Sequence, residues 1–80
     1  MEHTYRKTAT IKAEQFDGSP KMMKKYNIQY GDTGLGYAYY LPTKEGDMVI
    51  EEGDYIATGV QGEHWAIGDS IFEATYERID

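Results

Sequence analysis

The strongest constraint on the fold is a run of turn residues and short apolar segments in the C-terminal half of the chain. Gly53 and Asp54 predict a tight turn, because glycine adopts positive φ readily and aspartate bonds to its own backbone. Residues 55–58 then read as a short strand of β-branched and aromatic side chains. The loop Gly59–Gly62 carries glycine at both ends, which is typical of a hairpin. Residues 63–67 return as the partner strand.

The partner strand presents two faces, because side chains alternate across a sheet. Trp65 and Ile67 share one face and are the expected core pair, whereas His64 and Ala66 share the other. We expect Trp65 to be mostly buried against the sheet and against Phe72.

A short helical turn is expected after this hairpin. Ser70, followed three residues later by Glu73, has the spacing of a capping box. Phe72 and Tyr76 are four residues apart, so they can stack on one face of that turn.

The N-terminal part of the chain predicts one long strand over residues 5–16. Ala9, Ile11 and Ala13 would share one face of this strand. Phe16 has the opposite parity, so we expect a bulge or a twist near residues 14–15 if Phe16 is buried.

The middle of the chain predicts a helix and two more strands. Ser19 would cap a helix that starts at Pro20 and runs to Tyr26, with its methionines docked on the sheet. Residues 30–36 contain three glycines and are expected to be a mobile loop. A phosphate-binding role is not favoured for that loop, since no Lys-Ser/Thr pair follows it. Strands are expected over residues 37–41 and 47–51.

These elements predict an α+β fold for residues 1–80, which we treat as a single small domain. Short turns between successive strands favour antiparallel pairing in sequence order. We therefore expect about five strands in one twisted antiparallel sheet, partly curled into a barrel, with one short helix. An all-β fold is the near alternative.

Composition excludes several classes of function. The chain has 80 residues, no cysteine and a formal net charge of −6. The charge argues against direct binding of nucleic acid, because phosphate contacts need clustered Lys and Arg. The lack of cysteine is typical of a cytoplasmic protein, and no apolar run is long enough to span a membrane. The acidity also leaves open a surface that imitates nucleic acid.

Catalytic and metal-binding constellations are not evident. His64, Glu63 and Asp69 could be considered as metal ligands, but a site of this kind needs three or four convergent groups. Ser19 and Ser70 both look like helix caps rather than nucleophiles. We therefore expect neither a cofactor nor enzymatic activity.

A set of residues at the two ends of the chain follows a recognisable pattern: Gly53, Asp54, Tyr55, Ile56, Gly59, Gly62, Glu63, Trp65, Ile71, Phe72, Thr75, Tyr76 and Glu77, with Tyr5, Arg6, Lys7, Ile11, Ala13, Phe16, Asp17 and Gly18. Through these residues the chain resembles a family of small, mostly uncharacterised proteins of tailed bacteriophages. The family pattern is Gly-Asp-aromatic-Ile, then Gly-x-x-Gly-Glu and an aromatic, then Ile-Phe-x-x-Thr-Tyr-Glu. Residues 19–45 match poorly, and many relatives carry Pro-Cys-x-Pro where this chain has residues 66–69. The resemblance implies phage origin and a compact fold, and it carries no activity.

Three functions are compatible with this reading. The first is an accessory protein that binds and inhibits a host protein, for instance a component of a bacterial defence system. The second is a protein that sequesters a small nucleotide signal through the glycine-rich loop, with Tyr40 or Trp65 stacking on the base and Lys24, Lys25 and Arg6 meeting the phosphates. The third is a minor virion or assembly protein.

The expected contact surface combines the tyrosine-rich strand with the hairpin tip. Eight tyrosines are many for a chain of this length, and tyrosine gives rigid amphipathic contact area. Exposed strand edges also make a homodimer an expected state. The candidate binding residues are Tyr37, Tyr39, Tyr40, Val60, Gln61 and His64.

Overall fold

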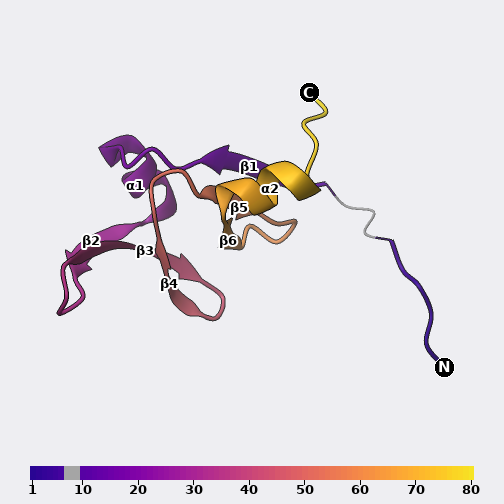
Figure 1. Ribbon diagram of the computed structural model, residues 1–80, viewed down its shortest axis with the longest axis horizontal. Helices are drawn as coiled ribbons and strands as arrows, with labels where there is room; N and C mark the ends of the chain where they lie inside the picture. Colours follow the sequence, from indigo (N-terminus) through magenta and orange to yellow (C-terminus); the bar gives the residue numbers. More distant parts are fainter. Residues whose placement is uncertain (7–9) are drawn as a thin grey trace.

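The structure is a computed structural model that describes residues 1–6 and 10–80 (Figure 1). Within the described residues it contains two short helices and six strands, so most of the regular structure is β. In chain order the elements are β1 (Lys12–Gln15), α1 (Pro20–Tyr26), β2 (Gln29–Asp32), β3 (Tyr37–Thr43), β4 (Gly46–Ile50), β5 (Tyr55–Thr58), β6 (His64–Ile67) and α2 (Asp69–Thr75).

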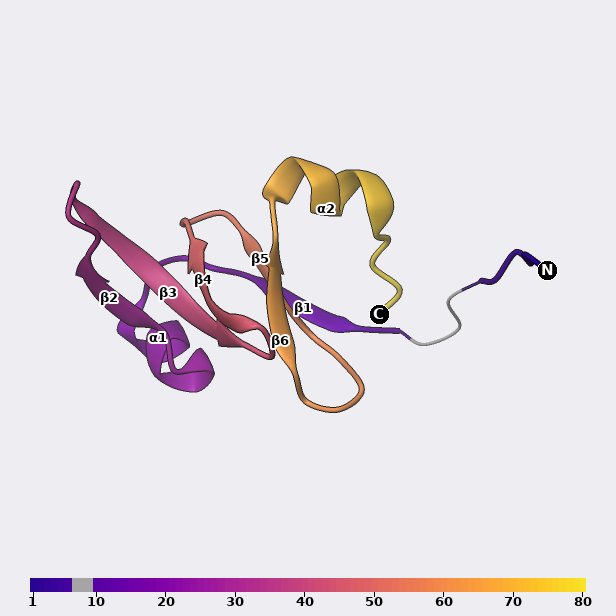
Figure 2. The ribbon, with the colours of Figure 1, turned by 90° about the horizontal axis from the view of Figure 1, so that it is seen from below.

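The strands form two three-stranded antiparallel sheets instead of the single curled sheet that the sequence predicts. Sheet A has the order β1-β5-β6 and sheet B the order β2-β3-β4. The two sheets meet where β6 lies against β3 and β4, and they do not close into a barrel (Figure 2). The antiparallel pairing and the short helix are confirmed. The pairing in sequence order is wrong for β4 and β5, which lie in different sheets, and the barrel, the strand number and the helix number are also wrong.

The turn between β4 and β5 explains why one sheet becomes two. The Asp54 amide donates to the Glu51 carbonyl at 3.1 Å, and the Glu51 amide donates to the Asp54 carboxylate at 2.9 Å. This turn separates β5 from β4 and brings it beside the N-terminal segment. The Phe16 amide then donates to the Asp54 carbonyl, and the Gly53 amide donates to the Phe16 carbonyl, both at 2.8 Å.

The first strand is shorter than predicted, and its buried side is the one that carries Phe16 instead of the one that carries Ala13. Residues 12–15 form β1, and residues 7–9 of the predicted strand lie outside the described residues. Phe16 is buried with 1% of its surface exposed, on the same side of the chain as Glu14. The pairing of β1 with β5 is regular over residues 12–15, so the predicted bulge is wrong. The error came from taking the Ala13 face as the buried one.

One hydrophobic core lies between the sheets and α1. The helix starts as predicted, since the Ser19 hydroxyl accepts from the Met22 amide at 3.2 Å and Pro20 occupies its first turn. It ends at Asn27, which adopts the left-handed conformation with φ 60°. The buried core residues are Phe16, Met22, Tyr26, Ile28, Leu41, Ile50 and Ile56.

The second helix, α2, packs on the face of sheet A that points away from the hydrophobic core. Residues paired across an antiparallel ladder share a face, and Ile56 lies opposite Ala66 whereas Ala57 lies opposite Trp65. Ala66 therefore faces the core, and the prediction that Trp65 and Ile67 form the core pair is wrong. Trp65 is half-buried and lies outside the core cluster.

The start of α2 also differs from the predicted capping box. Gly68 is the N-cap residue and no side-chain bond caps the helix, while Asp69 accepts from the Ser70 amide at 2.7 Å. The predicted stacking of Phe72 on Tyr76 is confirmed, with ring centroids 4.8 Å apart and planes 16° apart. Phe72 stacks equally flat on Tyr55 of β5, at 4.0 Å and 13°.

The glycine-rich segment is mostly strand and tight turn. Residues 29–32 form β2, so the first part of the expected loop is paired with β3. The remaining residues close a turn in which the Thr33 amide donates to the Gly36 carbonyl at 2.8 Å. The Asp32 carboxylate accepts from the Gly34 amide at 2.7 Å. Gly34 and Gly36 have φ of 91° and 146°, conformations that favour glycine.

Candidate binding surface

Three tyrosines gather on one face of sheet B, and we call Tyr30, Tyr37 and Tyr39 the tyrosine patch. Tyr30 on β2 lies directly opposite Tyr39 on β3. Tyr37 and Tyr39 share a face because they are two residues apart on one strand. The same face carries Leu41, which is fully buried, so the patch continues the core outward.

The rings of the patch form a continuous series with a core residue. Tyr37 stacks on Tyr30 with centroids 5.4 Å apart and planes 15° apart. Tyr30 meets Tyr39 at 4.7 Å, and Tyr39 meets the Phe16 ring edge-on at 4.9 Å. All three separations lie in the favourable range for aromatic pairs. The outer rings are therefore held by neighbours that are themselves fixed by the core.

Exposure increases along this series of rings. Phe16 is 1% exposed and Tyr39 is half-buried, whereas Tyr30 and Tyr37 are 55% and 66% exposed. Leu35, at the tip of the adjacent turn, is completely exposed. The two outer rings, Tyr30 and Tyr37, thus form an exposed aromatic surface that is connected to the core through Tyr39.

Acidic side chains border the tyrosine patch. Asp32 is paired with Tyr37 across β2 and β3, and Glu52 lies close enough to Tyr39 to affect its ionisation. Burial raises the pKa of Tyr39, and the Glu52 carboxylate raises it further. The Tyr39 phenol therefore stays neutral at physiological pH and can donate a hydrogen bond.

The structure separates the predicted site residues into three places. Tyr37 and Tyr39 belong to the tyrosine patch, whereas Tyr40 is half-buried on the opposite face of sheet B, beside Gly31. Val60 and Gln61 are exposed at the turn between β5 and β6.

The hairpin tip lies far from Tyr37. The Gln61 amide oxygen accepts from the Lys44 ammonium at 3.0 Å, so the tip is beside the β3–β4 turn. Tyr37 is at the other end of β3, about 20 Å away at the usual rise of a strand (Figure 2). Tyr37 and the tip therefore do not form one contact surface within a single copy.

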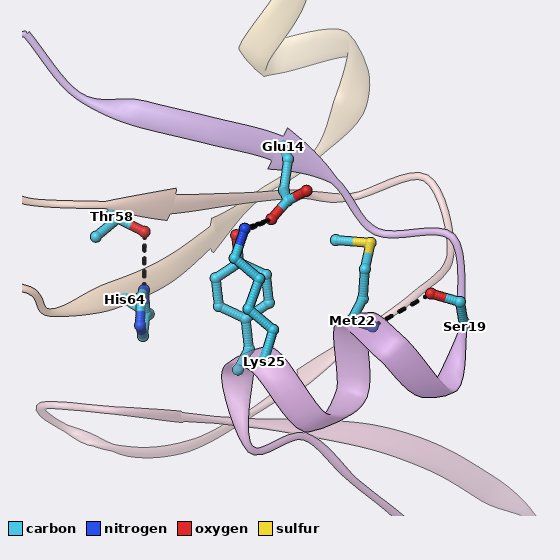
Figure 3. Close-up of polar contacts among 7 residues, drawn as sticks. Glu14, Ser19, Met22, Lys25, Thr58 and His64 are labelled. Atoms are coloured by element: carbon cyan, nitrogen blue, oxygen red, sulfur yellow. Dashed lines mark hydrogen bonds and ion pairs between the residues drawn. The ribbon is translucent and has the colours of Figure 1, made fainter.

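His64 has structural partners that account for its position. Its Nδ1 lies 3.0 Å from the Thr58 hydroxyl, directly across the β5–β6 ladder (Figure 3). Its ring meets the Tyr26 ring edge-on at 5.0 Å. These contacts place His64 against α1, on the core side of sheet A.

A second polar cluster joins β1 to α1. The Glu14 carboxylate accepts from the Lys25 ammonium (Figure 3). It also accepts from the Tyr26 hydroxyl. Both contacts lower the pKa of Glu14, and the bond from Lys25 has the larger effect. Tyr26 is 6% exposed. Its burial raises the pKa of its phenol, and its bond to Glu14 raises that pKa further. The cluster therefore joins α1 to β1, and Lys25 is paired with Glu14.

Replacing Glu14 with Gln should lower the free energy of unfolding at neutral pH by about 1 kcal/mol, since the ion pair is partly exposed and solvent weakens it. A carboxyl group whose pKa is lower in the folded state stabilises the fold above its unfolded pKa. That contribution is lost as the pH falls through the folded pKa. The difference between wild type and variant should therefore shrink below about pH 4.

Urea denaturation at a series of pH values measures this difference. Glu45→Gln is the matched control, because Glu45 is exposed in the β3–β4 turn. A difference that grows as the pH falls would contradict the role given to Glu14.

The expected nucleotide site is not assembled in one place. Lys25 bonds to Glu14, Gly34 and Gly36 lie in the β2–β3 turn, and Arg6 lies in the N-terminal segment (Figure 1). No group of three or more potential metal ligands is found among residues 1–6 and 10–80.

A groove of about 870 Å³ lies between β1 and the C-terminal segment, and sequence reasoning missed it. Its lining includes the stacked rings of Tyr55, Phe72 and Tyr76 as well as Lys12 and Arg78. The sequence signal for the rings was the four-residue spacing in α2. Nothing local indicated that β1 would lie beside them.

Tyr30 is the other residue that sequence reasoning missed. Its alternation with Ile28 was a strand signal, but the neighbouring glycines favoured a loop.

Each helix of the described structure has seven residues, and neither has the length and hydropathy needed to cross a bilayer. Comparison of the chain with protein-family models, curated proteins and solved structures finds no significant match.

Proposed function

We propose that this protein is a non-enzymatic binding protein that docks its tyrosine patch onto a host protein and inhibits it. The carrying observation is that two exposed rings, Tyr30 and Tyr37, are stacked on each other and supported from the core. Tyrosine is enriched at binding hot spots, and a ring that is already fixed loses little entropy on binding. The patch therefore supports recognition of a partner through shape and apolar contact.

The charge around the patch supports a partner with a basic border. Asp32 and Glu52 lie beside the rings, and the chain has a net charge of −6. Complementary charge speeds encounter and selects among partners. We infer a host surface that has an apolar pocket for Tyr37 surrounded by Lys and Arg.

The phage context supports inhibition as the consequence of binding. The resemblance to small phage proteins favours a role inside an infected bacterium, and a defence component is the proposed class of target. A small chain can inhibit such a target by covering its working surface, which needs no chemistry of its own.

Replacing Tyr37 with Ala should weaken partner binding by about 2 kcal/mol or more, which is the usual threshold for a hot spot. Tyr30→Ala should also weaken binding, because it removes the ring on which Tyr37 stacks. The partner is first captured from host lysate with wild-type protein, and its affinity for each variant is measured by calorimetry. Melting curves confirm that each variant is folded.

Tyr40→Ala is the matched control, since Tyr40 lies in the same strand on the opposite face. It should bind the partner with wild-type affinity. The proposal fails if folded Tyr37→Ala and Tyr30→Ala proteins bind like wild type.

A further inference from the structure

β1 is an open edge of sheet A. It pairs with β5 on one side, and the sheet order places no described strand on its other side. The opposite edge strand, β6, lies against β3 and β4. Residues 10–15 also line the groove of about 870 Å³, whose other wall is formed by Phe72, Tyr76 and residues 77–80.

The hydrogen bonds of sheet A define which groups point to this open side. The Phe16 amide donates inward to the Asp54 carbonyl, and inward and outward groups alternate along an antiparallel strand. Glu14 and Lys12 therefore direct their amides and carbonyls toward β5. Ala13 and Gln15 direct theirs away from the sheet.

We propose that two copies of this chain pair through their β1 edges, antiparallel and centred on Ala13, to form one six-stranded sheet. In this register the two copies of Ala13 lie opposite each other and exchange two backbone hydrogen bonds. Lys12 lies opposite Glu14 of the second copy, on the same face of the joined sheet. The pairing is two-fold symmetric, so each of these contacts occurs twice.

Charge complementarity favours a second copy as the occupant of this edge. Among the described edge strands that are open, β1 carries charges of both signs, whereas β2 and β4 carry only Asp32 and Asp47. Opposite charges directly across a ladder stabilise the pair, and like charges destabilise it. Glu14 remains able to accept from Lys12 because a carboxylate has about four acceptor sites.

The β1 edge is a different surface from the tyrosine patch. The patch belongs to sheet B, so a dimer through β1 leaves Tyr30 and Tyr37 exposed and presents two patches. Failure of either proposal leaves the other intact.

A single introduced thiol tests the register directly, because the chain has no cysteine. Two residues in a hydrogen-bonded antiparallel pair have Cα atoms about 5.5 Å apart, which a disulfide can bridge. Ala13→Cys should therefore form a covalent dimer rapidly under mild oxidation, as read on a non-reducing gel. Val49→Cys, on the exposed side of β4, is the control and should cross-link much more slowly. Equal rates would overturn the proposal.

Sedimentation equilibrium tests the same edge without a thiol. Ala13→Pro removes an amide that points away from β5, so the monomer should keep its melting curve. It removes both central hydrogen bonds and should weaken the dimer about 100-fold, if each bond contributes about tenfold. Lys12→Glu places like charges opposite each other twice and should weaken it about tenfold. Lys21→Glu makes the same charge change in α1 and should have no effect.

A wild-type protein that is monomeric at high micromolar concentration overturns the proposal. So does a dimer whose dissociation constant is unchanged by both Ala13→Pro and Lys12→Glu, since another surface would then join the copies.

Discussion

Replacing Phe16 with Ala is expected to lower the free energy of unfolding by about 3–5 kcal/mol, the usual range for truncating a buried phenylalanine. Phe16 is 1% exposed and lies in the core cluster with Leu41, Ile50 and Ile56. Its ring also meets the Tyr39 ring, so its removal leaves a cavity between the two sheets. A domain of 80 residues has little stability to spare, and much of the variant should be unfolded at room temperature.

Trp65→Ala is the informative comparison, because tryptophan is the larger residue but lies outside the core cluster. Its half-buried position predicts a smaller loss than that of Phe16→Ala. Urea denaturation followed by circular dichroism measures both free energies. A larger loss for Trp65→Ala would show that the principal core lies on the α2 side of sheet A.

Replacing Ile50 with Ala is expected to cost about 2–5 kcal/mol, the range for a buried isoleucine. Ile50 is 2% exposed and lies directly opposite Tyr39 in sheet B. Its neighbour Val49 is 57% exposed on the other face of the same strand. Val49→Ala should therefore change stability by about 0.5 kcal/mol or slightly more, as surface changes in a strand do.

The adjacent pair tests which face of sheet B is buried, since the two substitutions act on the same backbone. Both variants are unfolded in urea under identical conditions. Equal losses at the two positions would mean that both faces of sheet B are covered.

Local signals predicted the pieces of this fold well. Ser19 and Pro20 set the start of α1, and the turn at Gly59–Gly62 joins β5 to β6 as expected. These features depend on a few neighbouring residues. The division into two sheets depends instead on β1 pairing with β5, across about 40 residues of chain, and no local pattern specifies that partner.

The candidate site was predicted to the same extent and for the same reason. Strand alternation correctly placed Tyr37 and Tyr39 on one face and Tyr40 on the other. Tyr30 completes the patch because it is paired with Tyr39 on the neighbouring strand. Alternation within one strand does not predict which residue of another strand lies opposite. Val60 and Gln61 were placed in the expected surface because the sequence predicts the turn that carries them. It does not predict how far that turn lies from Tyr37.

The long interval between β1 and β5 also has a consequence for the order of events during synthesis. Sheet B is built from residues 29–50, so its hairpins can form while the C-terminal part of the chain is still on the ribosome. β1 leaves the ribosome before sheet B, yet it must wait for residues 55–58 before it has a partner. A segment made before sheet B thus gains its strand partner after it, and the Phe16 amide and carbonyl can be bonded only once Gly53 and Asp54 have been made.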